Sequence, residues 1–198
     1  LQVVGTATAT TFAGALTGNV TGNVTSSGTS AFSTLTMSGN LNSFNILPVS
    51  NTTYNIGSAS LGYNVVYAKA TSAQYADLAE VYESDGKYDA GTVVVFGGEK
   101  EITQCNGGND TRVAGVISEN PAYLMNSKAN GLPVALLGKV KCKVVGYITK
   151  GDMLATHNNF PGVAKKISDP TPGTIIGKAL EDYSSEEIGT IDIVVGRC

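Results

Sequence analysis

The first 68 residues of this 198-residue chain contain no Asp, Glu, Lys or Arg. All of its charged residues, 13 basic and 16 acidic, follow from Lys69 onward. Protein surfaces in water are normally about a quarter or more charged, so an uncharged segment of this length is unusual for a chain that stands alone. The chain therefore consists of two parts of different character that meet near Lys69.

Long apolar runs are also missing from the uncharged part. Its run Val65 to Ala68 is far shorter than the roughly 20 residues of a membrane-spanning helix. A secretory signal peptide is a poor interpretation, because there is no basic start and no apolar centre. The net charge is −3, which gives no indication of nucleic-acid binding. We expect no membrane insertion and no nucleic-acid partner.

Cysteine and histidine are scarce. The three cysteines, Cys105, Cys142 and Cys198, form no CxxC pair, and their odd number argues against a disulfide scaffold. His157 is the only histidine, so neither a zinc site nor a Ser-His-Asp triad is expected. Phosphate-loop, dinucleotide and nucleophile-elbow motifs are absent from the sequence. We expect no metal and no cofactor, and the sequence favours a role other than catalysis.

The uncharged part is rich in small polar residues: Thr, Ser, Asn and Gly make up 37 of its 68 residues. A tandem repeat, TGNV-TGNV, spans Thr17 to Val24. Alternation of Thr with small or apolar residues, clearest in Thr6 to Thr10 and partial in Phe32 to Met37, favours short β-strands, and Gly-Asn pairs favour tight turns. Disorder is the alternative that low complexity suggests.

Such strands carry too few large apolar residues to build a core within one chain. Repeating units that cannot bury their own faces need neighbours, which are either further repeats or other copies of the chain. We favour three copies wound about one axis, with Val and Phe central and with Thr and Asn bridging between chains.

The run from Gly5 to Val24 resembles the shaft repeats of tail fibres from tailed bacteriophages, especially cyanophages. Tyr54 to Ser58, followed by Tyr63 to Ala68, is similar to the element that often closes such a shaft before a C-terminal module. The resemblance implies a homotrimeric virion fibre, located in the tail or another appendage and assembled in the host cytoplasm. Its implied partners are further copies of itself, other virion proteins and a host cell-surface glycan.

Three regions are predicted. Residues 1–70 form the repetitive β-shaft, residues 71–86 a connecting segment with a short helix as one option, and residues 87–198 a β-barrel or sandwich tip of short antiparallel strands. A second short helix fits at Pro121 to Ser127. The expected strands, separated by Gly, Pro and Asn breaks, are 92–96, 112–117, 133–137, 139–144, 152–156, 162–167, 173–180 and 190–195. The class is all-β, and a fragment beginning after Lys87 is expected to fold without the shaft.

The connecting segment contains an acidic group, Asp77, Glu80, Glu83 and Asp85, that could hold an acid/base pair, and a helix would place the first three on one face. Tyr75 to Glu80 is loosely similar to the Tyr-Ala-Glu opening of phage domains that cleave themselves off after guiding trimer assembly, with Asp in place of Glu. The alternative function is therefore an autoproteolytic assembly domain of the same fibre, and a solvated acidic face is the plainer interpretation. A secreted bacterial adhesin is a third hypothesis, which predicts a signal sequence upstream.

Receptor recognition is predicted on loops, because regular strands are occupied with packing. The candidate loops are Cys105 to Asp110 and Ala155 to Pro161, whose amides and other polar groups can hydrogen-bond to sugar hydroxyls, although either can equally be a plain connection. The candidate residues are Asn106, Asn109, Asp110, His157, Asn158 and Asn159. A rival electrostatic site is the stripe of Lys139, Lys141 and Lys143, which is also explained as an exposed strand face. Tyr123, Tyr147 and Tyr183 could supply stacking for a sugar.

Overall fold

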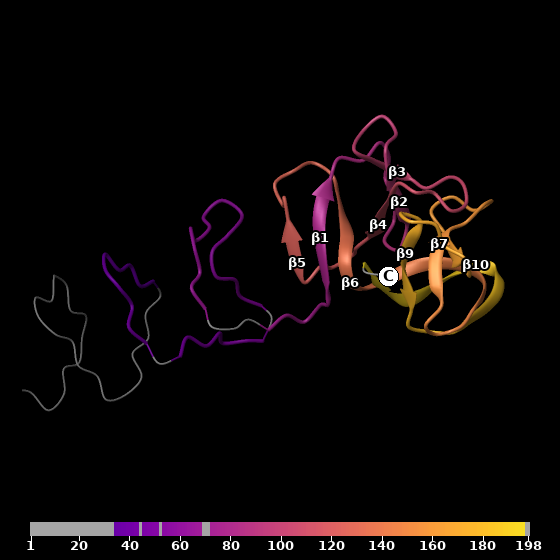
Figure 1. Cartoon of the computed structure of the whole chain (residues 1–198). Coiled ribbons are helices and arrows are strands. Elements are labelled where there is room, and N and C mark those ends of the chain that lie inside the picture. Colours follow the sequence, from indigo (N-terminus) through magenta and orange to yellow (C-terminus); the bar gives the residue numbers. More distant parts are fainter. Residues whose placement is uncertain (1–33, 44, 52, 69–71, 197–198) are drawn as a thin grey trace, which may run out of the picture. The chain divides into compact units, whose positions relative to one another are not determined.

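The computed structural model describes residues 34–43, 45–51, 53–68 and 72–196 (Figure 1). The chain divides into two compact units, Leu1–Val65 and Val66–Cys198. The TGNV repeat, the strand predicted at Thr6 to Thr10 and Cys198 lie outside the described residues. No helix among the described residues is long and apolar enough to cross a membrane.

The described part of the first unit consists of turns, bends and extended chain. These residues form neither helix nor strand in the single chain. The alternation predicted at Phe32 to Met37 lies partly outside the described residues, and the strand there stays a prediction for the assembled shaft. Large apolar side chains remain exposed; Leu47 is 82% exposed and Val49 93%. The β-shaft and its trimer stay predictions.

The second unit is built from ten strands that form one continuous sheet. Their bounds are β1 Asp77–Tyr82, β2 Val93–Phe96, β3 Ile102–Gln104, β4 Val113–Ile117, β5 Tyr123–Met125, β6 Leu132–Ile148, β7 Met153–Thr156, β8 Ala164–Lys166, β9 Ile175–Ala179 and β10 Tyr183–Val195. All helices are absent from the described residues, and the predicted all-β class is confirmed.

Five strands close a barrel. The second half of β6 pairs with β8, and the pairing continues through β7, β9 and β10 back to β6. All neighbours in this ring are antiparallel except β6 and β8. The barrel interior holds Cys142, Val144, Leu154, Ile176 and Ile193, each at most 2% exposed. Closure leaves this part of the sheet without free edges.

The first half of β6 carries the sheet beyond the barrel. It pairs with β4, which leads to β2 and β3, and also with β1, which leads to β5 (Figure 1). A second, smaller core lies here, built on Val94, Ile102, Ile117 and Val134. The 17-residue β6 is therefore the element that joins the two halves of the unit.

Most predicted strands exist, with differences that tertiary pairing explains. The segments 133–137 and 139–144 were predicted as two strands but are one, β6, because Gly138 takes a φ of 104° and lets the strand continue through a distortion. In 139–144 the predicted alternation is confirmed, with lysines outward and Val140, Cys142 and Val144 buried.

Both helix predictions are wrong. Within 71–86 the chain forms β1, in which Asp77, Ala79 and Val81 alternate as buried residues, because β6 and β5 pair with its backbone. Within Pro121 to Ser127 it forms β5, which runs parallel to β1. The expectation that residues after Lys87 hold the full strand set is also wrong, since β1 precedes them and belongs to the same sheet.

Candidate functional site

The two loops proposed separately for recognition lie against each other. One connects β3 to β4 and the other connects β7 to β8. The backbone N–H of Asn109 donates to the carbonyl of Thr156 at 3.2 Å, and the N–H of Gly162 donates to the carbonyl of Cys105 at 2.9 Å. We call residues 105–112 and 157–163 together the paired-loop surface.

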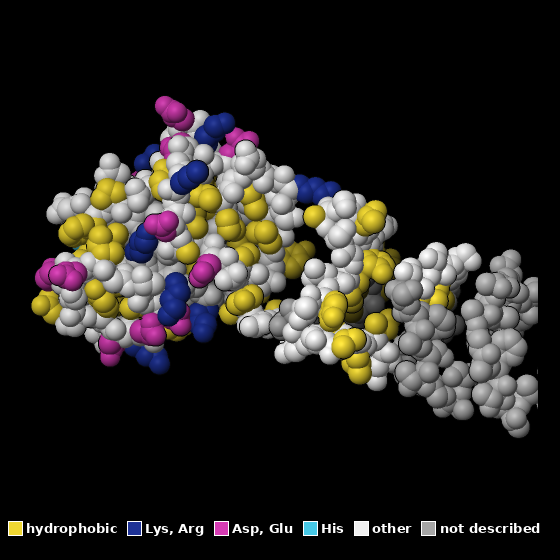
Figure 2. All heavy atoms as spheres, turned by 180° about the vertical axis from the view of Figure 1, so that it is seen from behind, with side chains coloured by type: hydrophobic (Ala, Val, Ile, Leu, Met, Phe, Trp, Pro, Cys, Tyr) yellow, Lys and Arg dark blue, Asp and Glu magenta, His cyan; other side chains and the backbone are white. Residues whose placement is uncertain are grey.

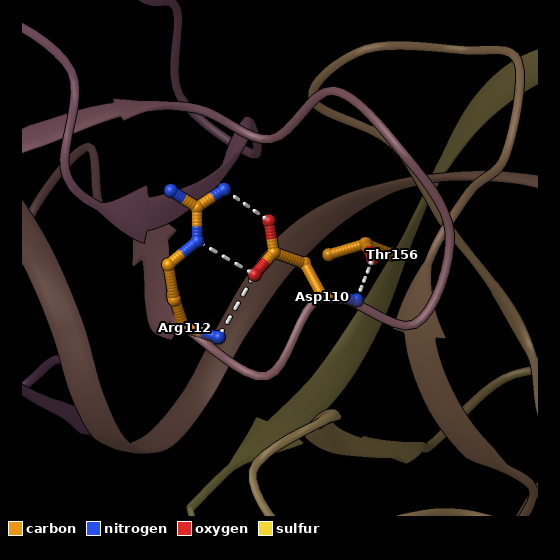
Figure 3. A network of polar contacts seen from close by, with 3 residues as sticks. All are labelled: Asp110, Arg112 and Thr156. Carbon is orange, nitrogen blue, oxygen red and sulfur yellow. Dashed lines mark hydrogen bonds and ion pairs between the residues drawn. The ribbon is translucent and has the colours of Figure 1, made fainter.

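The buried Thr156 anchors this contact. Its hydroxyl accepts a hydrogen bond from the N–H of Asp110 at 2.9 Å, as Figure 3 shows. Asn109 adopts a left-handed backbone with a φ of 55°, which turns the chain toward β7. Asn tolerates this conformation better than most residues, so the residue type suits the turn.

Gly108 allows the two loops to approach closely. A Cβ atom at this position would collide with the side-chain amide of Asn158. That amide oxygen in turn accepts a hydrogen bond from Lys165 Nζ at 2.6 Å. A larger residue at this position would force the Asn158 side chain to move away from Lys165.

Asp110 and Arg112 form a close pair at one end of the surface. The guanidinium donates to the carboxylate through Nε at 3.0 Å and through a terminal nitrogen at 2.7 Å, and the backbone N–H of Arg112 adds a third bond (Figure 3). Hydrogen bonding to Arg112 lowers the pKa of Asp110 below its usual range. The Asp110 carboxylate therefore already has hydrogen-bond partners within its own loop.

His157 organises the second loop. Its Nδ1 accepts hydrogen bonds from the backbone N–H groups of Asn159 and Phe160 at 3.0 and 3.2 Å. Its ring lies 4.9 Å from that of Phe160. Burial and the nearby Lys165 lower the pKa of His157, while Glu186 opposes the shift. The imidazole is therefore neutral near pH 7, with its proton on Nε2.

Three of the six predicted residues thus hold the loops, and three are open to a ligand. Asp110, His157 and Asn158 are engaged as described. Among the described residues, the side chains of Asn106, Asn109 and Asn159 are exposed and find no hydrogen-bond partner. Sequence reasoning missed Phe160, which follows Asn159 and is 38% exposed, although an aromatic residue within the polar turn was a visible signal.

The lysine stripe is less available than its sequence suggests. Lys141 Nζ lies 2.9 Å from Asp192, Lys139 Nζ lies 3.8 Å from the same carboxylate, and Lys143 Nζ lies 3.8 Å from Asp89. Figure 2 shows basic and acidic side chains intermixed on the visible face. The carboxylates offset the positive charge that an anionic surface would recognise, which weakens the electrostatic hypothesis.

The three tyrosines proposed for stacking are not gathered into one platform. Tyr147 is opposite Ser184, and its neighbour Ile148 is opposite Tyr183, so Tyr147 and Tyr183 point to different faces of the β6–β10 pair. The hydroxyl of Tyr183 donates to the carbonyl of Glu187 at 2.8 Å. Tyr123 lies on β5.

The acidic group of the connecting segment is also divided. In a strand, Asp77 and Glu80 point to opposite faces, whereas a helix would have placed them together. Glu80 accepts a hydrogen bond from the hydroxyl of Tyr82 at 2.8 Å, and burial together with Glu80 raises the pKa of Tyr82 to about 12. Asp77 and Glu80 therefore do not form a paired acid and base within this chain.

Comparison with models of protein families found no match, and comparison with curated proteins found no relative. Among solved structures, the chain is similar to the N base of head fibre gp8.5 of bacteriophage phi29, at 15% identity and a TM-score of 0.37. The similarity covers 60% of this chain and 93% of that one. A similarity of this size is too weak to assign a function.

Proposed function

We propose that this chain is part of a trimeric fibre of a phage virion, with an uncharged segment that resembles the shaft repeats of tail fibres. Residues 1–70 form the shaft, and the β unit forms a tip that attaches to a host-surface glycan or to another virion component. The fibre assembles in the host cytoplasm and binds no nucleic acid.

The observation that carries this proposal is the state of the uncharged segment. Its large apolar side chains are exposed: Ile46 by 73%, Leu47 by 82%, Ile56 by 82% and Tyr67 by 96%. In a segment that also contains no charged residue, so many exposed large apolar side chains support an association that buries them. Because the segment also lacks charge, association with further copies is the arrangement that removes its apolar groups from water.

Sedimentation of the full chain tests the oligomer. We expect a trimer at micromolar concentration that persists at high salt, since apolar burial does not depend on charge pairing. A folded monomer under those conditions would contradict the proposal. A dimer would contradict the threefold arrangement while leaving self-association intact.

We assign attachment to the paired-loop surface, which carries exposed amides and the exposed ring of Phe160 on a backbone held by cross-loop hydrogen bonds. The test compares adsorption to host cells of the wild type with that of an Asn106→Ala, Asn109→Ala and Asn159→Ala variant. We expect the variant to lose adsorption and the wild type to keep it at about 1 M salt, where the Debye length is about 3 Å. Adsorption that survives the replacements but is lost at high salt would instead assign attachment to the lysine stripe.

The autoproteolytic alternative predicts a change of chain mass. We expect the mass of the purified full chain to stay constant on incubation, with the same result for Asp77→Asn and Glu80→Gln, because no acid–base pair is formed by these residues within the chain. Mass spectrometry that finds cleavage near Asp77 in the wild type and not in the variants would establish the alternative.

A further inference from the structure

A cleft away from the paired-loop surface contains a buried carboxylate. It lies where the start of β1, the loop before β2, the β4–β5 loop and the middle of β6 meet, and its volume is about 300 Å³. Asp77 lines this cleft and is 4% exposed. Its Oδ2 is buried and has no hydrogen-bond partner among the described residues.

An unsatisfied buried carboxylate oxygen is costly and calls for an explanation. The strand pairing fixes the backbone of Asp77, which is opposite Gly138 on β6, and its carbonyl accepts the N–H of Ala122 at 2.9 Å. These contacts fix the backbone of Asp77 at the wall of the cleft, and its carboxylate keeps an acceptor oxygen without a partner among the described residues.

The other lining groups restrict what that donor belongs to. Lys139 and Lys141 also line the cleft, and both approach Asp192. Each ammonium has three N–H donors, so the pairing with Asp192 leaves donors available to a ligand. Glu119 and Asp192 supply further carboxylates to the lining.

This combination discriminates between ligand classes. A phosphate or carboxylate would face Asp77 and Glu119, and an ammonium group would face the two lysines. A hydroxyl group both donates and accepts, so it can satisfy Asp77 and take a hydrogen bond from a lysine. Neighbouring hydroxyls on a sugar ring match these alternating groups.

The remaining lining residues suit a sugar as well. Asn120 supplies an amide, Ser118 a hydroxyl, and Tyr75 a half-exposed ring. The volume is at the lower end of ligand pockets, which suits one sugar residue and not an extended chain. We propose that this cleft binds a single neutral sugar residue of a glycan, with Asp77 accepting from a ring hydroxyl.

The inference rests on the proposed attachment function, and it places a second glycan contact outside the paired-loop surface. The test measures binding of the full chain to a panel of neutral hexoses and N-acetylhexosamines by saturation-transfer NMR. Asp77→Asn and Asn120→Ala are the test variants. Asp169→Asn, an exposed site remote in sequence from the cleft, removes the same charge and serves as the control.

We expect the wild type and Asp169→Asn to bind a panel sugar, and both test variants to bind it at least about tenfold more weakly. Asp77→Asn should retain or raise the melting temperature, because it removes a charge from a buried atom without a partner. If Asp77→Asn unfolds, Asn120→Ala decides the question, since that side chain is exposed.

Binding that is unchanged in both variants would overturn the inference and leave attachment through the loops standing. Absence of binding to every panel sugar would also overturn it, with an internal water as the partner of Asp77. Loss of cell adsorption in the Asn106, Asn109 and Asn159 variant would then still support the proposed function, whereas its persistence would contradict attachment through the loops as well.

Discussion

At the scale of single residues, His157 gives the second loop a dependence on pH. Its neutral Nδ1 accepts two backbone hydrogen bonds, so protonation there would break them. Burial and the nearby Lys165 disfavour the cation while Glu186 opposes this, and the folded pKa of His157 is lowered from its ordinary value. A lowered histidine pKa contributes stability that is complete above about pH 6.5 and is lost as the pH falls toward the folded value.

We therefore expect the wild-type melting temperature to fall between about pH 7.5 and pH 5.5, and the fall to be smaller in His157→Gln. The variant should be less stable than the wild type at the higher pH because it loses the ring acceptor. Hydrogen bonds lower the pKa values of Asp110 and Asp152, so these groups titrate below this window. An equal fall in both proteins would assign the pH dependence to other groups.

Gly108 sets the distance between the two loops. We expect Gly108→Ala to reduce the free energy of unfolding by about 1 kcal/mol or more, because its Cβ would displace Asn158 from Lys165. In an Asn158→Ala background the same change should cost much less, since the obstructing amide is gone. Urea unfolding of the four proteins measures this coupling, and additive effects would contradict the contact.

At the scale of elements, the sequence predicts most strands but not how they join. Alternation identified the exposed and buried sides of 139–144 because lysines and apolar residues follow the period of a strand. Gly138 read as a break, yet a glycine can take a positive φ and let a strand continue. The apolar pattern of residues 77–82 is compatible with the period of a helix or of a strand. The segment is a strand because its backbone pairs with β6.

The candidate site was likewise predictable in its local features but not in its long-range contacts. Polar turn residues identified both loops from the sequence. Their contact depends on a hydrogen bond between Asp110 and Thr156, which are 46 positions apart, and no local signal indicates such a pair. The unsatisfied carboxylate of Asp77 was likewise outside the reach of sequence reasoning, since it depends on burial by strands that are distant in sequence.

The continuity of β6 depends on Gly138, and a matched glycine in the same strand provides the control. Gly138 has a φ of 104°, and an added Cβ would collide with the carbonyl oxygen of Ala76; Gly146 has a φ of 95° with nothing within 4 Å. We expect Gly146→Ala to cost about 1–2 kcal/mol for the left-handed backbone. Gly138→Ala should cost clearly more, because the collision adds to the same strain.

Urea denaturation of both variants measures the difference. Equal losses for Gly138→Ala and Gly146→Ala would mean that the start of β1 can move away from β6 without penalty. A larger loss at Gly146 would contradict the packing around both glycines.

At the scale of the whole molecule, the change in composition near Lys69 and the start of the first strand of the β unit fall at different residues. Charge begins at Lys69, but the sheet begins with β1 at Asp77. The predicted tip boundary at residue 87 would therefore remove a strand. In β1, Ala79 is fully buried and Val81 is 5% exposed, and the strand pairs with β6 from Asp77 to Tyr82.

We expect a fragment of residues 72–198 to fold, and a fragment of residues 87–198 to be less stable by at least about 2 kcal/mol. Burial of one Val side chain alone accounts for about 2 kcal/mol, and the loss of β1 also leaves the β6 edge and β5 unpaired. Chemical denaturation with the same probe compares the two fragments. Adding a synthetic peptide of residues 72–86 to the shorter fragment should restore part of the stability, because the missing strand can pair again with β6. Equal stability of the two fragments would show that the five-strand barrel holds the unit by itself and that β1 is dispensable.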